Sequence, residues 1–176
     1  ESFLADSSAG KRAAKIESLL NSPSYAAWWA TKLCDITGNN PRRAADQQLG
    51  EQQSRQWYDW IHRRVRENVP YDKIVEGIAL AVSRSPGQSY EDYCQEMSSY
   101  FHTDKPADFS ARETMPYFWS RGREGAQAKE KAMSFSYAFL GVRLQCAECH
   151  KHPFDQWTKE DFDQFTAFFQ PVVYAN

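Results

Sequence analysis

Residues 144 to 157 bring together the side chains most capable of chemistry in this 176-residue chain. The segment reads LQCAECHKHPFDQW and holds two of the four cysteines and two of the four histidines within seven positions. Thiolates and imidazoles can bind metals, exchange disulfides and anchor haem. The spacing of these residues distinguishes among the three kinds of chemistry.

Cys146, Cys149 and His150 follow the C-x-x-C-H pattern of covalent c-type haem attachment. Two thiols three positions apart on one helical turn can form thioethers to the two vinyl groups along one edge of the porphyrin. The adjacent imidazole is then held where it can bind the iron. Random placement would give this pattern roughly 0.002 times per chain of this composition. We therefore predict one haem c, attached at Cys146 and Cys149, with His150 as the proximal iron ligand.

Two other C-x-x-C chemistries stay open. A structural zinc site could use both cysteines with one or both of His150 and His152, but such sites usually pair two ligand clusters across a loop. The remaining cysteines and histidines are scattered along the chain. A thioredoxin-like redox pair expects a preceding strand, and no βαβ pattern precedes Leu144. Both alternatives have less support than haem attachment.

Helical periodicity recurs along the chain, and alternating strand patterns are absent. Serines at positions 22, 89 and 110 match N-cap signatures, and proline-containing breaks separate the helical segments near positions 41, 70, 86 and 106. With 15% aromatic residues the chain can bury a real core. We predict one all-α domain over residues 1–176, with seven or eight short helices around one haem c. We do not assign it to the common small cytochrome c fold.

A helix is predicted on each side of the C-x-x-C-H motif. The first runs from about Gly125 to Leu140 and stops near Gly141, with an apolar stripe of Ala126, Met133, Tyr137 and Leu140. The second is capped by Thr158 with Asp161 and ends before Pro171, with an apolar face of Phe162, Phe165, Phe168 and Phe169. Large apolar side chains near the motif suit the wall of a flat apolar ligand, and those predicted to pack on the haem are Phe154, Trp157 and Phe165.

Charge and hydropathy narrow the classes of partner. The 21 basic and 23 acidic residues are interspersed, so the chain shows no electrostatic footprint for nucleic acid or an anionic membrane. No apolar stretch approaches the roughly 20 residues that cross a bilayer. Because no leader precedes Glu1 and no initiator Met is present, we expect an excised domain or a processed product.

Two long stretches of the chain resemble one family. Residues 139 to 169, FLGVRLQCAECHKHPFDQWTKEDFDQFTAFF, closely resemble the core of the planctomycete-type cytochrome c domain, a family catalogued as a domain of unknown function. Residues 3 to 38, FLADSSAGKRAAKIESLLNSPSYAAWWATKLCDITG, resemble its opening, and residues 88 to 109 match more loosely. The resemblance implies an extracytoplasmic haem c domain, commonly part of a larger multidomain protein. It also implies that Cys146 and Cys149 are the thioether positions and that His150 is the proximal ligand.

Haem attachment through cysteines also indicates the compartment. In bacteria it occurs outside the cytoplasmic membrane, so we expect a periplasmic or equivalent extracytoplasmic location. In such a compartment Cys34 and Cys94 can form a disulfide, or each can remain a free thiol that packs as a small hydrophobe. The sequence leaves both alternatives open.

Three functions remain to be distinguished. The first is electron transfer or redox coupling with an unidentified redox partner protein or fused domain. The second is a haem-based catalyst or small-molecule sensor with an open iron position. The third is a helical interaction module with a structural metal site.

The identity of the sixth iron ligand separates the first two functions. Met115, which directly precedes Pro116 and an aromatic run, is our first candidate for this distal ligand, and His102 is the second. His62, Met97 and Met133 have less support, and the absence of any protein ligand stays open. His152 points away from His150 on a helix, so we expect it to form a local hydrogen bond or to lie at the rim of the site.

Overall fold

The computed structural model describes residues 2–44, 48–102, 104–120 and 128–170. Within these ranges no strand is present, so the all-α prediction is confirmed, and nine α-helices are described against the seven or eight predicted. The α-helices are α1 (Ser2–Ala5), α2 (Lys11–Leu20), α3 (Pro23–Thr37), α4 (Gly50–Arg66), α5 (Tyr71–Ala79), α6 (Tyr90–Phe101), α7 (Tyr117–Ser120), α8 (Ala128–Phe135) and α9 (Lys159–Ala167). Shorter turns are η1 (Pro41–Arg43), η2 (Phe109–Ala111), η3 (Ser136–Leu140) and η4 (Gln145–Glu148). None of the described helices is both long and apolar enough to cross a membrane.

Local capping explains where several helices begin. The side chains of Ser22, Ser89 and Thr158 each accept a hydrogen bond from the backbone N–H three residues on, and these bonds begin α3, α6 and α9. At α9 the bond is reciprocal, because the Asp161 carboxylate accepts from the Thr158 N–H. The predicted cap at Ser110 is wrong. Ser110 lies inside η2, where the carboxylate two residues before it acts as the cap.

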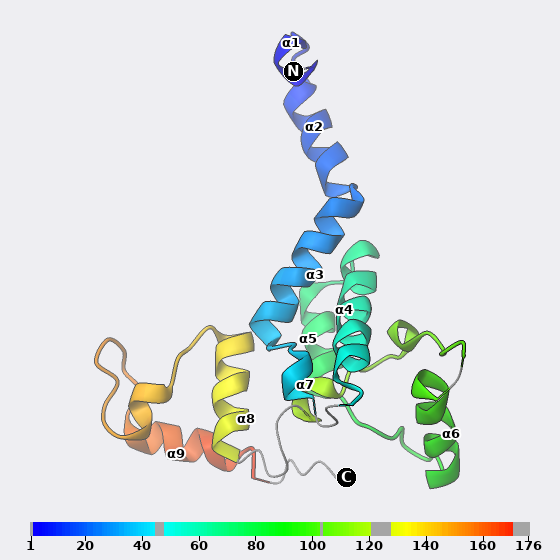
Figure 1. Ribbon diagram of the computed structural model, residues 1–176. Coiled ribbons are helices and arrows are strands. Elements are labelled where there is room, and N and C mark those ends of the chain that lie inside the picture. The colour runs from blue at the N-terminus through cyan, green and yellow to red at the C-terminus, as the bar shows by residue number, and fades with distance from the viewer. Residues whose placement is uncertain (1, 45–47, 103, 121–127, 171–176) are drawn as a thin grey trace.

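The main core forms where α3, α4, α5, η2 and α7 meet (Figure 1). α4 contributes the largest buried side chains, and Trp60 and Ile61 are fully buried. We use the name main core for the cluster of Ala30, Cys34, Trp57, Trp60, Ile61, Ile74, Ile78, Tyr100, Phe109, Met115, Tyr117, Phe118 and Ala138.

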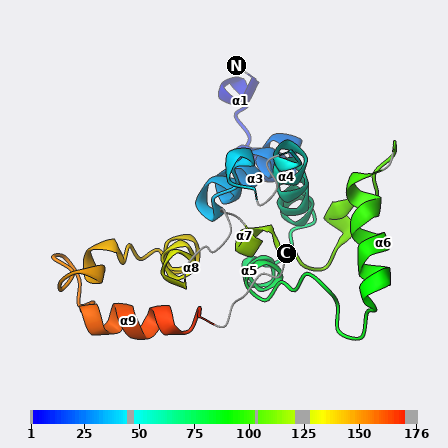
Figure 2. The same cartoon turned by 60° about the horizontal axis from the view of Figure 1, so that its bottom comes forward.

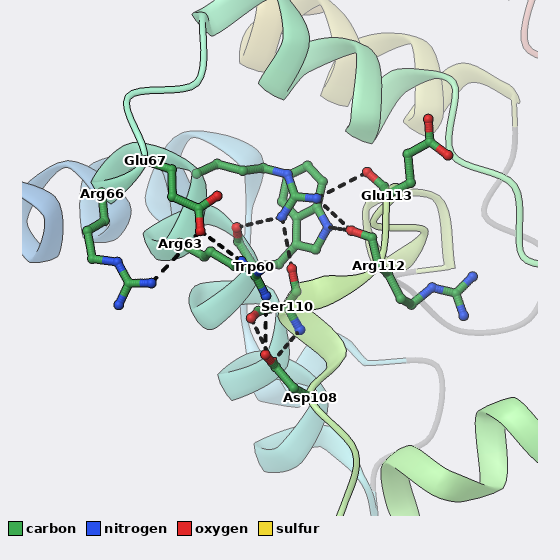
Figure 3. A network of polar contacts seen from close by, with 9 residues as sticks. Trp60, Arg63, Arg66, Glu67, Asp108, Ser110, Arg112 and Glu113 are labelled. Atoms are coloured by element: carbon green, nitrogen blue, oxygen red, sulfur yellow. Dashed lines mark hydrogen bonds and ion pairs between the residues drawn. The ribbon is translucent and has the colours of Figure 1, made fainter.

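Arg64 fixes the segment before α7 to α4, within the polar network around Trp60, Ser110, Arg112 and Glu113 (Figure 3). Its guanidinium lies 3.4 Å from the centre of the Trp60 ring and donates hydrogen bonds to the carbonyls of Ser110, Arg112 and Glu113. The Trp60 indole N–H also donates to the Arg112 carbonyl, at 3.0 Å. Burial lowers the pKa of Arg64 to about 10, so the side chain still carries its charge at neutral pH.

The N-terminal helices are largely exposed. α1, α2 and the start of α3 extend away from the rest of the molecule (Figure 1), and α2 has no buried residue. α3 packs on α4 through small side chains, among them Ala26, Ala30 and Cys34. Its tryptophans point the other way, with Trp28 55% and Trp29 39% exposed, while Leu33 packs against the main core.

A second hydrophobic cluster lies around the C-x-x-C-H motif, on the side of the molecule formed by α8, α9 and the segment between them (Figures 1 and 2). Phe169 joins it to the main core, because its ring contacts those of Phe165, Phe135 and Trp119 at centroid distances of 5.2, 5.6 and 6.0 Å. We call this second group the motif cluster. It comprises buried Leu144, Ala147 and Phe162 with partly buried Met133, Val142, Trp157 and Phe165.

Candidate functional site

The C-x-x-C-H motif forms one helical turn. η4 covers Gln145–Glu148, and the backbone N–H groups of Cys149 and His150 both donate to the Cys146 carbonyl, at 3.4 and 3.3 Å. The two thiols and the imidazole therefore project from a single turn, which is the geometry that haem attachment requires of this spacing.

The two sides of this turn have different surroundings. Ala147 is fully buried, Leu144 is 6% exposed, and both pack with Phe162 of α9. Cys146, Cys149 and His150 are exposed. The turn is thus anchored through its apolar residues while its reactive groups face solvent.

α8 holds the motif from the N-terminal side. An ion pair joins Lys129 of α8 to Glu148 within the motif. Between them the chain makes a π-helical turn, η3, and leaves it at Gly141, whose φ of 67° is a conformation that glycine adopts without strain. The predicted stop near Gly141 is confirmed. The start of the predicted helix, residues 125–127 with Ala126, lies outside the described residues.

The predicted apolar stripe of this helix is wrong at its end. Tyr137 and Leu140 are 43% and 55% exposed, whereas Ser136 and Ala138 are buried. A π-helical turn contains more residues than an α-helical turn, so it rotates the following side chains away from the α-helical register. Of the described residues of the predicted stripe, Met133 alone packs in the motif cluster.

The imidazole of His150 is oriented by the backbone. Its Nδ1 lies 2.7 Å from the carbonyl oxygen of Lys151. Because a carbonyl can only accept a hydrogen bond, this contact assigns the proton to Nδ1 and leaves the lone pair of Nε2 available. Metal-binding histidines commonly have this arrangement, in which one nitrogen donates to a backbone carbonyl and the other binds the metal.

The loop after the motif is closed by short hydrogen bonds. The N–H of His152 donates to the Trp157 carbonyl at 2.8 Å, and the Nδ1 atom of His152 accepts from the Phe154 N–H at 3.2 Å. Trp157 and Phe165 pack in the motif cluster, as side chains beneath the turn. Phe154 is 93% exposed. The three residues predicted to pack on haem therefore lie near the motif in the chain, but they do not form one cluster.

Comparison with known proteins places the chain in a family. Residues 1–174 match PSCyt2, described as "Protein of unknown function (DUF1549)". The chain belongs to the PSCyt2 family. No curated protein and no solved structure matches it. The predicted resemblance is confirmed at the level of family membership, and the description of PSCyt2 assigns no cofactor or activity.

Several large apolar side chains around the motif of this PSCyt2 domain face solvent. Tyr137, Leu140, Phe154 and Phe168 are 43%, 55%, 93% and 78% exposed. The prediction that Phe168 belongs to the apolar face of the last helix is wrong, because α9 ends at Ala167 and Phe168 points outward.

The candidates for a distal iron ligand lie apart from the motif, with one exception. Met115 is fully buried in the main core, and Met97 packs against that core from α6. His62 stacks on Tyr58 within α4, and His102 lies exposed at the end of α6. Only Met133 belongs to the motif cluster.

Cys34 and Cys94 are both free thiols in the structure, so no disulfide joins α3 to α6. Cys34 is buried, and the Asn39 amide donates to its sulfur at 3.5 Å. Burial raises the pKa of the Cys34 thiol to about 11. At neutral pH this cysteine is protonated and acts as a small core residue.

A cavity of about 470 Å³ was not anticipated from the sequence. It lies between α4 and residues 106–110 and is lined by Glu51, Arg55 and Asp59 together with Gln52, Gln56 and Phe109. The signal for it was the spacing of three charged residues at i, i+4 and i+8 along one face of α4. Burial raises the pKa of the Asp59 carboxyl, and the charge of Arg55 opposes that shift. Within the described ranges, no group of three or more His, Cys, Asp or Glu side chains is placed to hold a metal ion.

Proposed function

We propose that this PSCyt2 domain is an extracytoplasmic c-type cytochrome domain. One haem is attached covalently through Cys146 and Cys149, and His150 is its proximal iron ligand. The bound haem supplies a one-electron couple, with which the domain transfers electrons or supports a redox reaction of a partner protein or fused domain.

The orientation of the motif turn is the observation that carries this proposal. Covalent attachment requires both thiols to reach the two vinyl groups of one porphyrin. Cys146 and Cys149 are exposed on one side of a single helical turn, while fully buried Ala147 anchors its other side. A structural or disulfide-forming pair would not require an exposed imidazole at the next position.

The tautomer of His150 supports iron ligation. The contact of its Nδ1 with the Lys151 carbonyl leaves Nε2 free to donate its lone pair. A hydrogen bond from the distant ring nitrogen also raises the basicity of a ligating imidazole and fixes the plane of its ring.

The exposed apolar side chains near the motif support a large apolar ligand. Tyr137 and Leu140 lie just before the motif, and Phe154 and Phe168 lie after it. Covering such side chains with a porphyrin would remove apolar surface from water, which is favourable at about 25 cal/mol per Å². The structural-metal alternative has less support, because the described residues lack a preformed group of three ligands.

Acid–acetone extraction tests the covalent link. Purified from a host with haem c maturation, the protein is expected to retain its haem and to give the pyridine haemochrome spectrum of a thioether-linked haem. The Cys146→Ala/Cys149→Ala variant is expected to lose the attachment. Cys94→Ala, which removes a thiol of α6, is the matched control and should retain full haem. Release of all haem from the wild-type protein would contradict the proposal.

A further inference from the structure

A haem iron held by His150 has a second axial position on the opposite face of the ring. In cytochromes c that transfer electrons, a Met or His side chain fills this position, whereas an open position admits small molecules. The chain has three methionines and four histidines, and all seven lie within the described residues. The location of each methionine and histidine is therefore known.

Met115 and Met97 are committed to the main core. Met115 is fully buried there, and its N–H donates to the Gly77 carbonyl at 2.9 Å. The sulfur of Met97 lies 3.4 Å from the guanidinium of Arg112, which is itself paired with Glu96 at 2.5 Å. Neither side chain can reach a haem on the motif turn without leaving the core.

His62 and His102 lie on other parts of the molecule. His62 stacks on Tyr58, with ring centroids 5.6 Å apart on α4. His102 caps the end of α6. α6 and the segment that carries the motif lie at opposite sides of the molecule in two views (Figures 1 and 2).

The two remaining donors lie near the motif but on the wrong side of it. Met133 packs against Leu144 and Ala147, which form the buried side of the turn, opposite the exposed cysteines. His152 follows His150 by two residues, and its Nδ1 already accepts from the Phe154 N–H. With Nδ1 accepting this hydrogen bond, the neutral imidazole of His152 carries its proton on Nε2, so neither ring nitrogen offers a lone pair to iron.

We infer that no methionine and no other histidine of this chain supplies a second axial ligand, so that a haem held by His150 would leave its sixth position open to a small exogenous molecule. If haem is attached, that position would be able to take a neutral diatomic molecule such as CO in the ferrous state. This inference rests on the proposed haem attachment. It adds ligand binding at the iron to the redox role of the domain.

Spectroscopy of the purified holoprotein tests the open position. Haem attachment is first established by the pyridine haemochrome, and the dithionite-reduced protein is then titrated with CO. We expect a five-coordinate ferrous spectrum that converts completely to a CO complex at one CO per haem. Met115→Ala and His152→Gln should each leave the CO affinity unchanged within about twofold, because neither side chain is an axial ligand.

The outcomes separate the inference from the proposed function. A protein without covalent haem contradicts the proposed function. A holoprotein with a six-coordinate, low-spin ferrous spectrum overturns the inference alone, since another ligand then occupies the sixth position. If Met115→Ala or His152→Gln converts such a spectrum to the five-coordinate form, the substituted residue is that ligand.

Discussion

A single guanidinium joins α4 to the segment that leads to Met115. Arg64 donates to the carbonyls of three residues of this segment, Ser110, Arg112 and Glu113, while its guanidinium lies over the Trp60 ring. The planar fork of arginine can serve several acceptors at once, which the single ammonium of lysine cannot do in the same geometry. The position of Met115 within the main core depends in part on this contact.

Replacing Arg64 should therefore destabilise the fold. For Arg64→Leu we expect the free energy of unfolding to fall by about 2–3 kcal/mol, because partly buried carbonyls lose a charged donor. Urea denaturation measures the change. Arg66→Leu is the matched control, since Arg66 is 64% exposed and forms only a long ion pair with Glu67, at 3.9 Å, among the described residues. Its effect should stay below about 0.5 kcal/mol. Equal losses for the two variants would contradict the role of Arg64.

The spacing of the motif residues predicted that their side chains share one turn, but it did not predict the surroundings of those side chains. The positions of Cys146, Cys149 and His150 were sufficient to predict three reactive groups on one turn, because a helical turn fixes their relative directions. The carbonyl that orients His150 was not predictable, because it depends on how the backbone leaves the turn at Lys151. The exposure of Phe154 was not predictable either, because the hydrophobicity of a side chain does not determine whether the fold buries it.

At the scale of elements, α3 packs on α4 through the face that carries its small side chains. Ala26, Ala30 and Cys34 approach α4 closely, while Trp28 and Trp29 remain partly exposed. The Ser22 cap predicted where this helix begins, but the sequence does not show which face packs inward, because both faces carry apolar side chains. Small side chains permit close helix–helix approach, and the large tryptophans of α4 fill the core instead.

Two tryptophans should therefore differ in their contribution to stability. Trp60→Ala removes a fully buried side chain and should lower the free energy of unfolding by about 3–5 kcal/mol. Trp28→Ala removes a side chain that is 55% exposed and should cost less than about 1 kcal/mol. Thermal and urea unfolding of both variants provide the comparison. A larger loss for Trp28→Ala than for Trp60→Ala would show that the face of α3 has been assigned incorrectly.

Helix ends and helix registers differ in how well the sequence predicts them. The caps at Ser22, Ser89 and Thr158 depend on residues three positions apart, so local chemistry was enough to find them. The π-helical turn from Ser136 to Leu140 inserts an extra residue into the turn, and its stability depends on tertiary packing. For this reason the predicted apolar stripe was wrong beyond Met133, although the predicted helix end at Gly141 was correct.

At the scale of the whole molecule, the hydrophobic residues form two unequal groups. The main core contains thirteen buried residues, including Trp60 and Phe118, whereas the motif cluster contains three. Contacts of Phe169 with Phe135 and Trp119 connect the two groups. A small cluster has few buried contacts of its own, so it opens more readily than the core unless a ligand covers it.

If haem is attached as proposed, its loss should loosen the motif cluster and leave the main core ordered. In the Cys146→Ala/Cys149→Ala variant, we expect amide hydrogen exchange across residues 142–165 to accelerate about tenfold or more, because a group that binds only the folded form no longer stabilises it. Amides of α4 should exchange within about twofold of the holoprotein, since Trp57, Trp60 and Ile61 pack without contact to the motif cluster. Exchange measured by mass spectrometry on both proteins resolves the two regions. Equal protection of residues 142–165 with and without haem would mean that the cofactor lies on the surface of the motif turn and contributes nothing to its packing.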